Sequence, residues 1–135
     1  GKEIISEGVC GGVVTMGALI IAVKDKTNPA KAFTVSFSTP DFPVNEKKYL
    51  IKPKDYTLEK NPENEVSISF MEGLPNNKMN TWGSDIAKGT VQFVYNGNEV
   101  KCTLKNIVLS SAEMFNADDL KSDGTISGEL TFFKN

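Results

Sequence analysis

A hairpin with an alternating pattern constrains the fold of this chain more than any other feature of its sequence. The run GTVQFVYNGNEVKCTL, residues 89–104, alternates apolar and polar side chains on both sides of Asn96-Gly97. Asn-Gly is the preferred pair for a two-residue type I′ turn, in which both residues have positive φ. Such a turn predicts that Phe93 faces Val100 and that Val94 faces Glu99. Cross-strand partners share a face, so one face of the hairpin is apolar and the other is polar and exposed to solvent. The apolar face contains Val91, Phe93, Val100, Cys102 and Leu104, and the solvent-exposed face contains Thr90, Gln92, Lys101 and Thr103.

Similar alternation recurs along the chain and predicts further strands at residues 33–37, 66–70 and 126–132. Residues 19–23 are apolar on both faces, and residues 106–109 extend the strand that ends near Leu104 past a bend or bulge. Val, Ile and Thr number 30, against 16 for Leu, Ala, Gln and Arg, so β-forming residues dominate. The 135 residues therefore predict one domain over residues 1–135. Its fold class is all-β, an antiparallel β-sandwich or flattened barrel of about eight to ten strands.

Three stretches interrupt this pattern. Residues 40–65 contain four prolines, which allow only short edge-type strands near residues 49–51 and 56–58. Residues 72–88 are rich in Asn, Gly and Pro and are interpreted as a connection. Residues 111–121 begin with a candidate N-cap, Ser111, and are the one place where a short helix is expected.

The composition excludes several kinds of chemistry because the chain has neither His nor Arg; all 15 basic residues are Lys. Without imidazole there is no Ser-His-Asp or Cys-His nucleophile system and no His-ligated metal site. A net charge of −2 provides no basic excess for nucleic acid. No phosphate-binding or nucleophile-elbow motif occurs. We therefore expect a non-enzymatic protein without a cofactor or a metal, which does not bind nucleic acid.

Trp82 is the side chain that points most directly to a ligand. It lies among amide, hydroxyl and carboxylate groups, and a flat ring beside such groups at a loop rim suits a sugar or a peptide. The predicted ligand-binding residues are Trp82, Asn77, Asn80 and Asp85. In the alternative interpretation, Trp82 closes one open end of the sandwich or barrel, with its indole N–H bonded to a loop carbonyl.

The two cysteines, Cys10 and Cys102, lie too far apart in sequence for a CxxC redox or zinc pattern. One interpretation makes both of them small buried residues. The alternative is a Cys10–Cys102 disulfide, which would close a loop of about 93 residues and contribute about 4–5 kcal/mol in the chain-entropy model.

The C-terminal third carries a resemblance to a known group of proteins. The segments KGTVQFVYNGNEVKCTLKNIVLSS and DGTISGELTFF resemble the ending of small secreted or lipid-anchored all-β proteins of gut Bacteroidetes, which close a sandwich or a calycin-like (lipocalin-like) barrel. The resemblance implies an extracytoplasmic location, in the periplasm or at the cell surface, and a role in handling surface glycans or other ligands. It transfers no catalytic residue, and Cys10 has no lipobox before it. Gly1 is interpreted as a remnant of cloning or processing, with a native leader removed.

Together these observations predict a monomeric binding or interaction module of the cell envelope. Its expected partner is a glycan, a peptide or a small apolar ligand, and the uncharged run of residues 8–23 is too short and too rich in Gly for a transmembrane segment. The competing expectation is a calycin-like carrier of a small apolar molecule. Its barrel would be lined by residues such as Phe33, Phe37, Ile68, Phe70 and Phe93.

Overall fold

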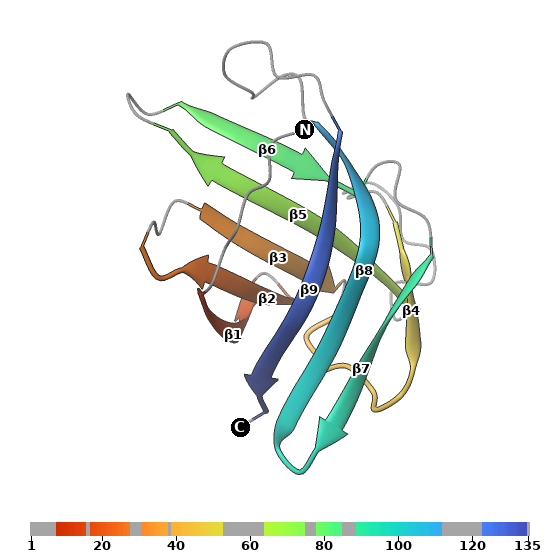
Figure 1. Cartoon of the computed structure of the whole chain (residues 1–135). Coiled ribbons are helices and arrows are strands. Elements are labelled where there is room, and N and C mark those ends of the chain that lie inside the picture. The colour runs from red at the N-terminus through yellow and green to blue at the C-terminus, as the bar shows by residue number, and fades with distance from the viewer. Residues whose placement is uncertain are drawn as a thin grey trace.

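Nine β-strands make up most of the described part of the computed structural model, which covers residues 8–15, 17–27, 31–37, 39–52, 64–74, 78–84, 89–111 and 123–134. The all-β class is confirmed. The strands are β1 (Gly8–Thr15), β2 (Ala18–Asp25), β3 (Lys31–Phe37), β4 (Lys48–Ile51), β5 (Glu65–Gly73), β6 (Met79–Gly83), β7 (Thr90–Asn96), β8 (Glu99–Ser111) and β9 (Gly124–Phe133) (Figure 1). Ser111, where the short helix was expected to begin, is the last residue of β8, and the rest of that segment lies outside the described residues.

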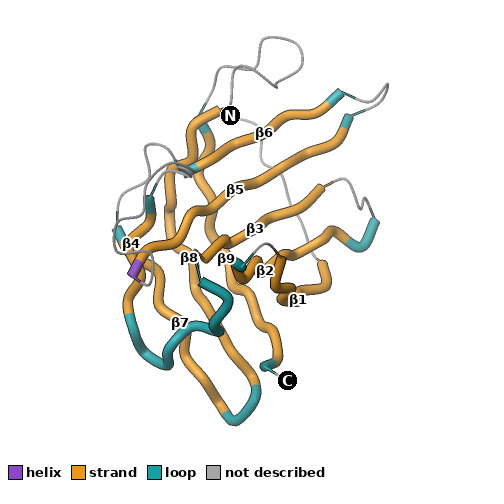
Figure 2. The backbone as a smooth tube through the Cα atoms, turned by 180° about the vertical axis from the view of Figure 1, so that it is seen from behind, coloured by secondary structure: helices purple, strands orange, loops and turns teal. Residues whose placement is uncertain are grey.

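The strands form one mixed sheet that folds over itself into two layers. Its order is β1-β2-β3-β5-β4-β7-β8-β6, with β9 on β8 and an additional pairing of β5 with β6. Strands β8 and β9 cross in front of β2, β3 and β5 in Figure 1, and Figure 2 shows the same layers from behind. Strand β4 pairs with both β5 and β7, and strand β6 pairs with both β5 and β8. Backbone hydrogen bonds through β4 and through β6 therefore join the two layers.

The sequence-based prediction for β4 was wrong in its position within the sheet. A strand occurs at residues 48–51, close to the expected residues 49–51, but it is an interior strand. It pairs in parallel with β5 and antiparallel with β7, so the sheet is not purely antiparallel. The prolines that suggested an edge all lie outside β4, whose own backbone groups are free to pair on both sides. The second strand expected there, at residues 56–58, lies outside the described residues.

The connection expected over residues 72–88 also contains a strand, which corrects the prediction. Strand β5 continues to Gly73, and β6 returns antiparallel to it, with Phe70 opposite Trp82 and Met71 opposite Thr81. The Asn- and Pro-containing residues 75–77 fall between these two strands, outside the described residues. The polar composition lowers the intrinsic strand propensity of β6, but cross-strand packing against β5 outweighs it.

The hairpin of β7 and β8 has the predicted faces but a register that is wrong by two residues. Asn96 pairs with Glu99 and Phe93 pairs with Cys102, so the two turn residues are Gly97 and Asn98. Gly97 has a φ of 63°, whereas neither asparagine has a positive φ. This is the pattern of a type II′ turn, which needs one left-handed residue at its first central position. A shift of two residues leaves every side chain on its original face, so the buried and exposed positions still follow the prediction.

Strand β8 is continuous through the bulge that the sequence indicated. Its register with β9 jumps between Leu104 and Ile107, and the intervening Asn106 has a φ of 50°. The Asn106 N–H donates a hydrogen bond to Ser127 Oγ at 2.9 Å. A bulge bends a strand and increases its twist. The bend lets the first part of β8 pair with β7 while its last residues pair with β6.

The core lies between the two layers and contains a cluster of aromatic rings. Phe93 has no exposed surface. Its ring centroid lies 5.4 Å from that of Phe37, 6.0 Å from that of Tyr49 and 6.3 Å from that of Phe132. Aliphatic side chains surround these rings. The buried apolar residues are Leu19, Ile21, Phe33, Val35, Phe37, Tyr49, Ile51, Val66, Ile68, Val91, Phe93, Val100, Cys102, Leu104, Ile107, Leu109, Leu130 and Phe132.

The loop from residue 39 to residue 47 covers one end of this core. The Phe42 ring stacks on that of Phe132 with 6.3 Å between centroids. Several hydrogen bonds fix the loop to β7. The Tyr95 hydroxyl donates to the Pro43 carbonyl, the Tyr95 N–H donates to Asn45 Oδ1 at 2.9 Å, and the Glu46 N–H donates to the Phe93 carbonyl at 2.8 Å. This end of the sandwich is therefore closed by side chains held in place by the backbone of β7.

Candidate functional site

The structure places two of the four predicted ligand residues together and leaves two outside the described residues. Trp82 and Asn80 both lie on β6, two positions apart, and therefore on the same face. Asn77 and Asp85 lie outside the described residues. Trp82 belongs to a strand and not to a loop rim as expected. The ligand-binding role of these four residues stays a prediction.

Trp82 and Asn80 face the same way as the core-side residues of β5. The Trp82 ring is partly buried and lies 5.7 Å from the ring of Phe70, its cross-strand partner. Asn80 stands opposite Glu72, and its side-chain Oδ1 is buried without a hydrogen-bond partner. A buried acceptor without a partner costs about 1–3 kcal/mol. Asn80 is therefore a polar group that a donor on a ligand would satisfy.

The two cysteines both contact the core. Cys102 is buried on β8, and the partly buried Cys10 of β1 packs against the same cluster. Burial raises the pKa of Cys10 to about 11. Burial, and after it the nearby Cys10, raises the pKa of Cys102 to about 12. Both are free thiols in the structure, and the disulfide stays a prediction.

The residues proposed to line a carrier cavity take part in packing. Four of them are buried, whereas Phe70 is partly buried against Trp82. Phe37 and Phe93 contact each other and Tyr49. The side chains that a carrier would use to surround a ligand therefore contact one another or other parts of the core.

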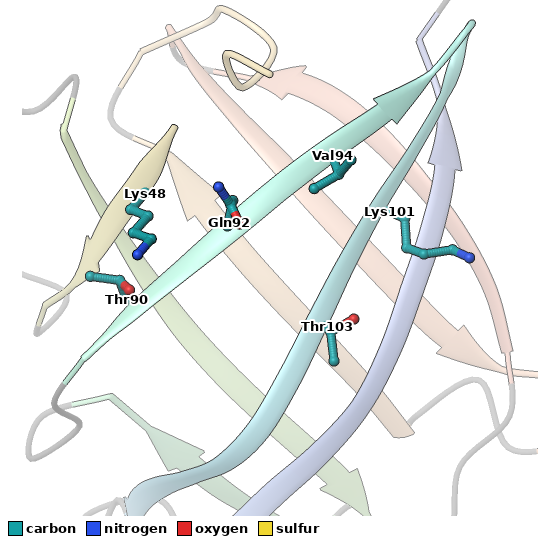
Figure 3. Close-up of a pocket in the computed structure, with 6 residues that line it drawn as sticks. All are labelled: Lys48, Thr90, Gln92, Val94, Lys101 and Thr103. Carbon is teal, nitrogen blue, oxygen red and sulfur yellow. The ribbon is translucent and has the colours of Figure 1, made fainter. Parts of the chain in front are cut away.

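A hollow lies on the opposite, outer face of the sheet, where β4, β7 and β8 meet. We call it the outer-face hollow. Its volume is about 460 Å³, which falls in the range of about 300–1,000 Å³ typical of small-molecule sites. Its lining residues are Lys48 of β4, Thr90, Gln92 and Val94 of β7, and Lys101 and Thr103 of β8 (Figure 3).

The hollow follows from the way β7 changes partners. Residues 90–92 pair with β4, whereas residues 93–96 pair with β8. Strand β8 therefore diverges from β7 beyond Cys102, and the outward side chains border the resulting fork. The sequence pattern placed four of the lining residues on the solvent-exposed face of the hairpin: Thr90, Gln92, Lys101 and Thr103. It could not indicate a concave surface, because the hollow is also bordered by β4.

The polar groups of the hollow are ammonium, hydroxyl and amide groups. Lys48 stands opposite Gln92 in the register of β4 and β7. The Gln92 Nε2 donates to the Glu46 carbonyl at 2.6 Å, which fixes the amide and leaves its Oε1 as an acceptor. Lys101 Nζ lies 3.6 Å from Glu129 Oε1, and both side chains are about half exposed. Exposed ion pairs of this kind contribute little to stability, so Lys101 can exchange Glu129 for another anion at small cost.

The described residues contain no cluster of His, Cys, Asp or Glu suited to a metal ion. In the same part of the chain, no helix has the length and apolar character needed to cross a membrane.

Comparison with known proteins found no matching family model, no matching curated protein and no matching solved structure.

Proposed function

We propose that this protein is a non-enzymatic binding module of the cell envelope and that it holds a polar, hydroxyl-bearing ligand, such as a glycan, in the outer-face hollow. The observation that carries the proposal is a concave surface of about 460 Å³ that is lined by hydroxyl, amide and ammonium groups. These groups hydrogen-bond to sugar hydroxyls, and the methyl groups of Val94 and the two threonines supply apolar contact. The absence of His and Arg from the whole chain supports recognition without catalysis.

The resemblance of the C-terminal third to secreted or lipid-anchored Bacteroidetes proteins supports the extracytoplasmic location. It rests on the hairpin of β7 and β8 and on β9, the same strands that supply or flank the hollow. The carrier alternative gains no separate support from the described residues, because three of the rings that would surround its ligand, those of Phe37, Phe70 and Phe93, lie 5.4–6.3 Å from other rings.

Filling the hollow tests the proposal. Thr103 is exposed on the outer face, so Thr103→Trp places a large ring in the hollow without entering the core. We expect this variant to lose binding on a glycan array and to keep the melting temperature of the wild type within about 2 °C. Thr125→Trp is the matched control, because Thr125 is an exposed threonine of β9 that does not line the hollow. Unchanged glycan binding by a folded Thr103→Trp protein would refute the proposal.

The same array separates the hollow from the surface around Trp82. Asn80→Ala removes the unpartnered acceptor of β6 and leaves the ring contact of Trp82 with Phe70 in place. We expect Asn80→Ala to bind as the wild type does. Loss of binding in Asn80→Ala, together with retention in Thr103→Trp, would assign the ligand to β6.

A further inference from the structure

We infer that the ligand of the outer-face hollow carries a carboxylate or sulfate group beside its hydroxyl groups, as an acidic sugar does, and that Lys48 binds the charged group. This inference rests on the proposed function and names the ligand class of the same site.

The charge of the lining is the first argument. Lys48 and Lys101 border the hollow, and none of the other four lining residues is acidic. A neutral sugar would leave the Lys48 ammonium without a counter-charge, whereas Lys101 already has Glu129 beside it. An anionic group placed in the hollow would gain electrostatic attraction that a neutral group lacks, even though solvent weakens it.

The second argument distinguishes the two lysines. Lys101 is engaged with Glu129, and Figure 3 shows its side chain extending over β9. No acidic side chain among the described residues forms an ion pair with Lys48. Its ammonium end lies beside the Thr90 side chain in Figure 3. Lys48 is therefore the cation available to a ligand, and Thr90 supplies a hydroxyl next to it.

The neutral groups complete the ligand description. The fixed Gln92 amide presents Oε1, which accepts a hydrogen bond, and each threonine hydroxyl both donates and accepts. These groups can therefore hydrogen-bond to the hydroxyl groups of a sugar, which a bare inorganic anion lacks. Since Lys provides a point charge and not the two-pronged fork of Arg, binding through Lys48 is expected to be weak and sensitive to salt.

The test compares three oligosaccharides by NMR titration of the wild-type protein: a galacturonic acid oligomer, a sulfated galactan oligomer and a neutral galactan oligomer of equal length. We expect at least one acidic oligomer to bind about three- to tenfold more tightly than the neutral one, with shifts at Lys48, Thr90 and Gln92. The two acidic probes distinguish a carboxylate from a sulfate. Raising the salt concentration from 50 to 500 mM should remove most of the preference.

Three variants locate the charge effect. Lys48→Gln should reduce the affinity for the acidic oligomer to that for the neutral one. Glu129→Gln frees Lys101 and should strengthen acidic binding by a few-fold. Lys105→Gln is the control, because Lys105 is an exposed lysine of β8 that does not line the hollow; it should leave the preference unchanged.

The outcomes separate this inference from the proposed function. Equal affinities for acidic and neutral oligomers, or an acidic preference that persists in Lys48→Gln, would overturn the inference while binding in the hollow stands. Binding of any oligomer that persists in Thr103→Trp would overturn both. Acidic oligomers that cause no shifts at Lys48 also overturn the inference.

Discussion

Removal of the Phe93 ring is the most direct test of the packed core on which surface binding depends. Phe93 has no exposed surface, and its ring meets those of Phe37, Tyr49 and Phe132. Truncation of a buried Phe to Ala costs about 3–5 kcal/mol, from lost transfer free energy and the cavity left behind. Because three aromatic contacts disappear together, we expect Phe93→Ala to fall in the upper half of that range, at about 4–5 kcal/mol.

This loss is large compared with the stability of a domain of this size. A typical domain has a free energy of unfolding of about 5–15 kcal/mol, so Phe93→Ala removes about a quarter of it or more. For a chain of 135 residues, the melting temperature should fall by about 15 °C. Urea unfolding at 25 °C, followed by circular dichroism and by Trp82 fluorescence, measures the change directly.

Two further variants keep the test decisive. Val94 follows Phe93 on the strand but points outward and is 44% exposed, so Val94→Ala should change stability by less than about 0.5 kcal/mol. Phe93→Leu keeps most of the volume and should cost about 1–1.5 kcal/mol, which remains measurable if Phe93→Ala does not fold. A loss below about 1.5 kcal/mol in a folded Phe93→Ala protein would refute the packed core, because the ring would then border an internal space, as a carrier requires.

Three other expectations follow from the structure. Tyr95→Phe removes the hydrogen bond to the Pro43 carbonyl and should lower the free energy of unfolding in urea by about 0.5–1.5 kcal/mol. Amide exchange should become faster only in residues 39–47, and unchanged exchange there would show that this bond does not hold the loop. Burial raises the pKa of the Cys10 thiol from 9.0 to about 11 and that of the Cys102 thiol to about 12. Well below pH 9 both thiols are protonated in the folded and the unfolded chain, whereas between pH 9 and pH 11 the unfolded chain releases more of these protons than the folded one. The free energy of unfolding should therefore fall from pH 9 towards pH 11, and a double Cys→Ala variant should show a shallower decline; equal slopes would disprove the raised pKa values. Asn106 has a φ of 50°, which is unfavourable for Ala but not for Gly. Asn106→Ala should therefore lower the free energy of unfolding by about 1–2 kcal/mol and Asn106→Gly by clearly less. Equal losses for the two variants in thermal unfolding would contradict backbone strain at the bulge.

The sequence predicted the faces of the strands better than their partners. Alternation at residues 33–37 and 66–70 gave the buried side of β3 and β5, because successive side chains of a strand point to opposite faces. The same rule could not fix the register of β7 and β8, since a shift of two residues preserves every face. The φ angles of Asn96 and Gly97 distinguish the observed type II′ turn from the predicted type I′ turn, and these angles depend on how the hairpin packs.

The candidate site was less accessible to sequence analysis than the fold. Trp82 was singled out by its polar neighbours, but its strand is recognisable only from pairing with β5 and β8. The outer-face hollow joins Lys48 to a hairpin more than 40 residues further along the chain. No local pattern records that contact, because β4 reaches β7 through a backbone ladder between distant segments.

By itself, the amino-acid sequence determined the all-β class, the alternation that builds the core and the absence of His and Arg chemistry, because these depend on residue type and local spacing. Only the tertiary structure decided that β4 lies inside the sheet, that residues 79–83 form a strand and that a hollow opens between β7 and β8. The physical reason is that hydrogen bonding between strands satisfies backbone groups without regard to sequence distance, so the choice of neighbours is made by the folded chain as a whole.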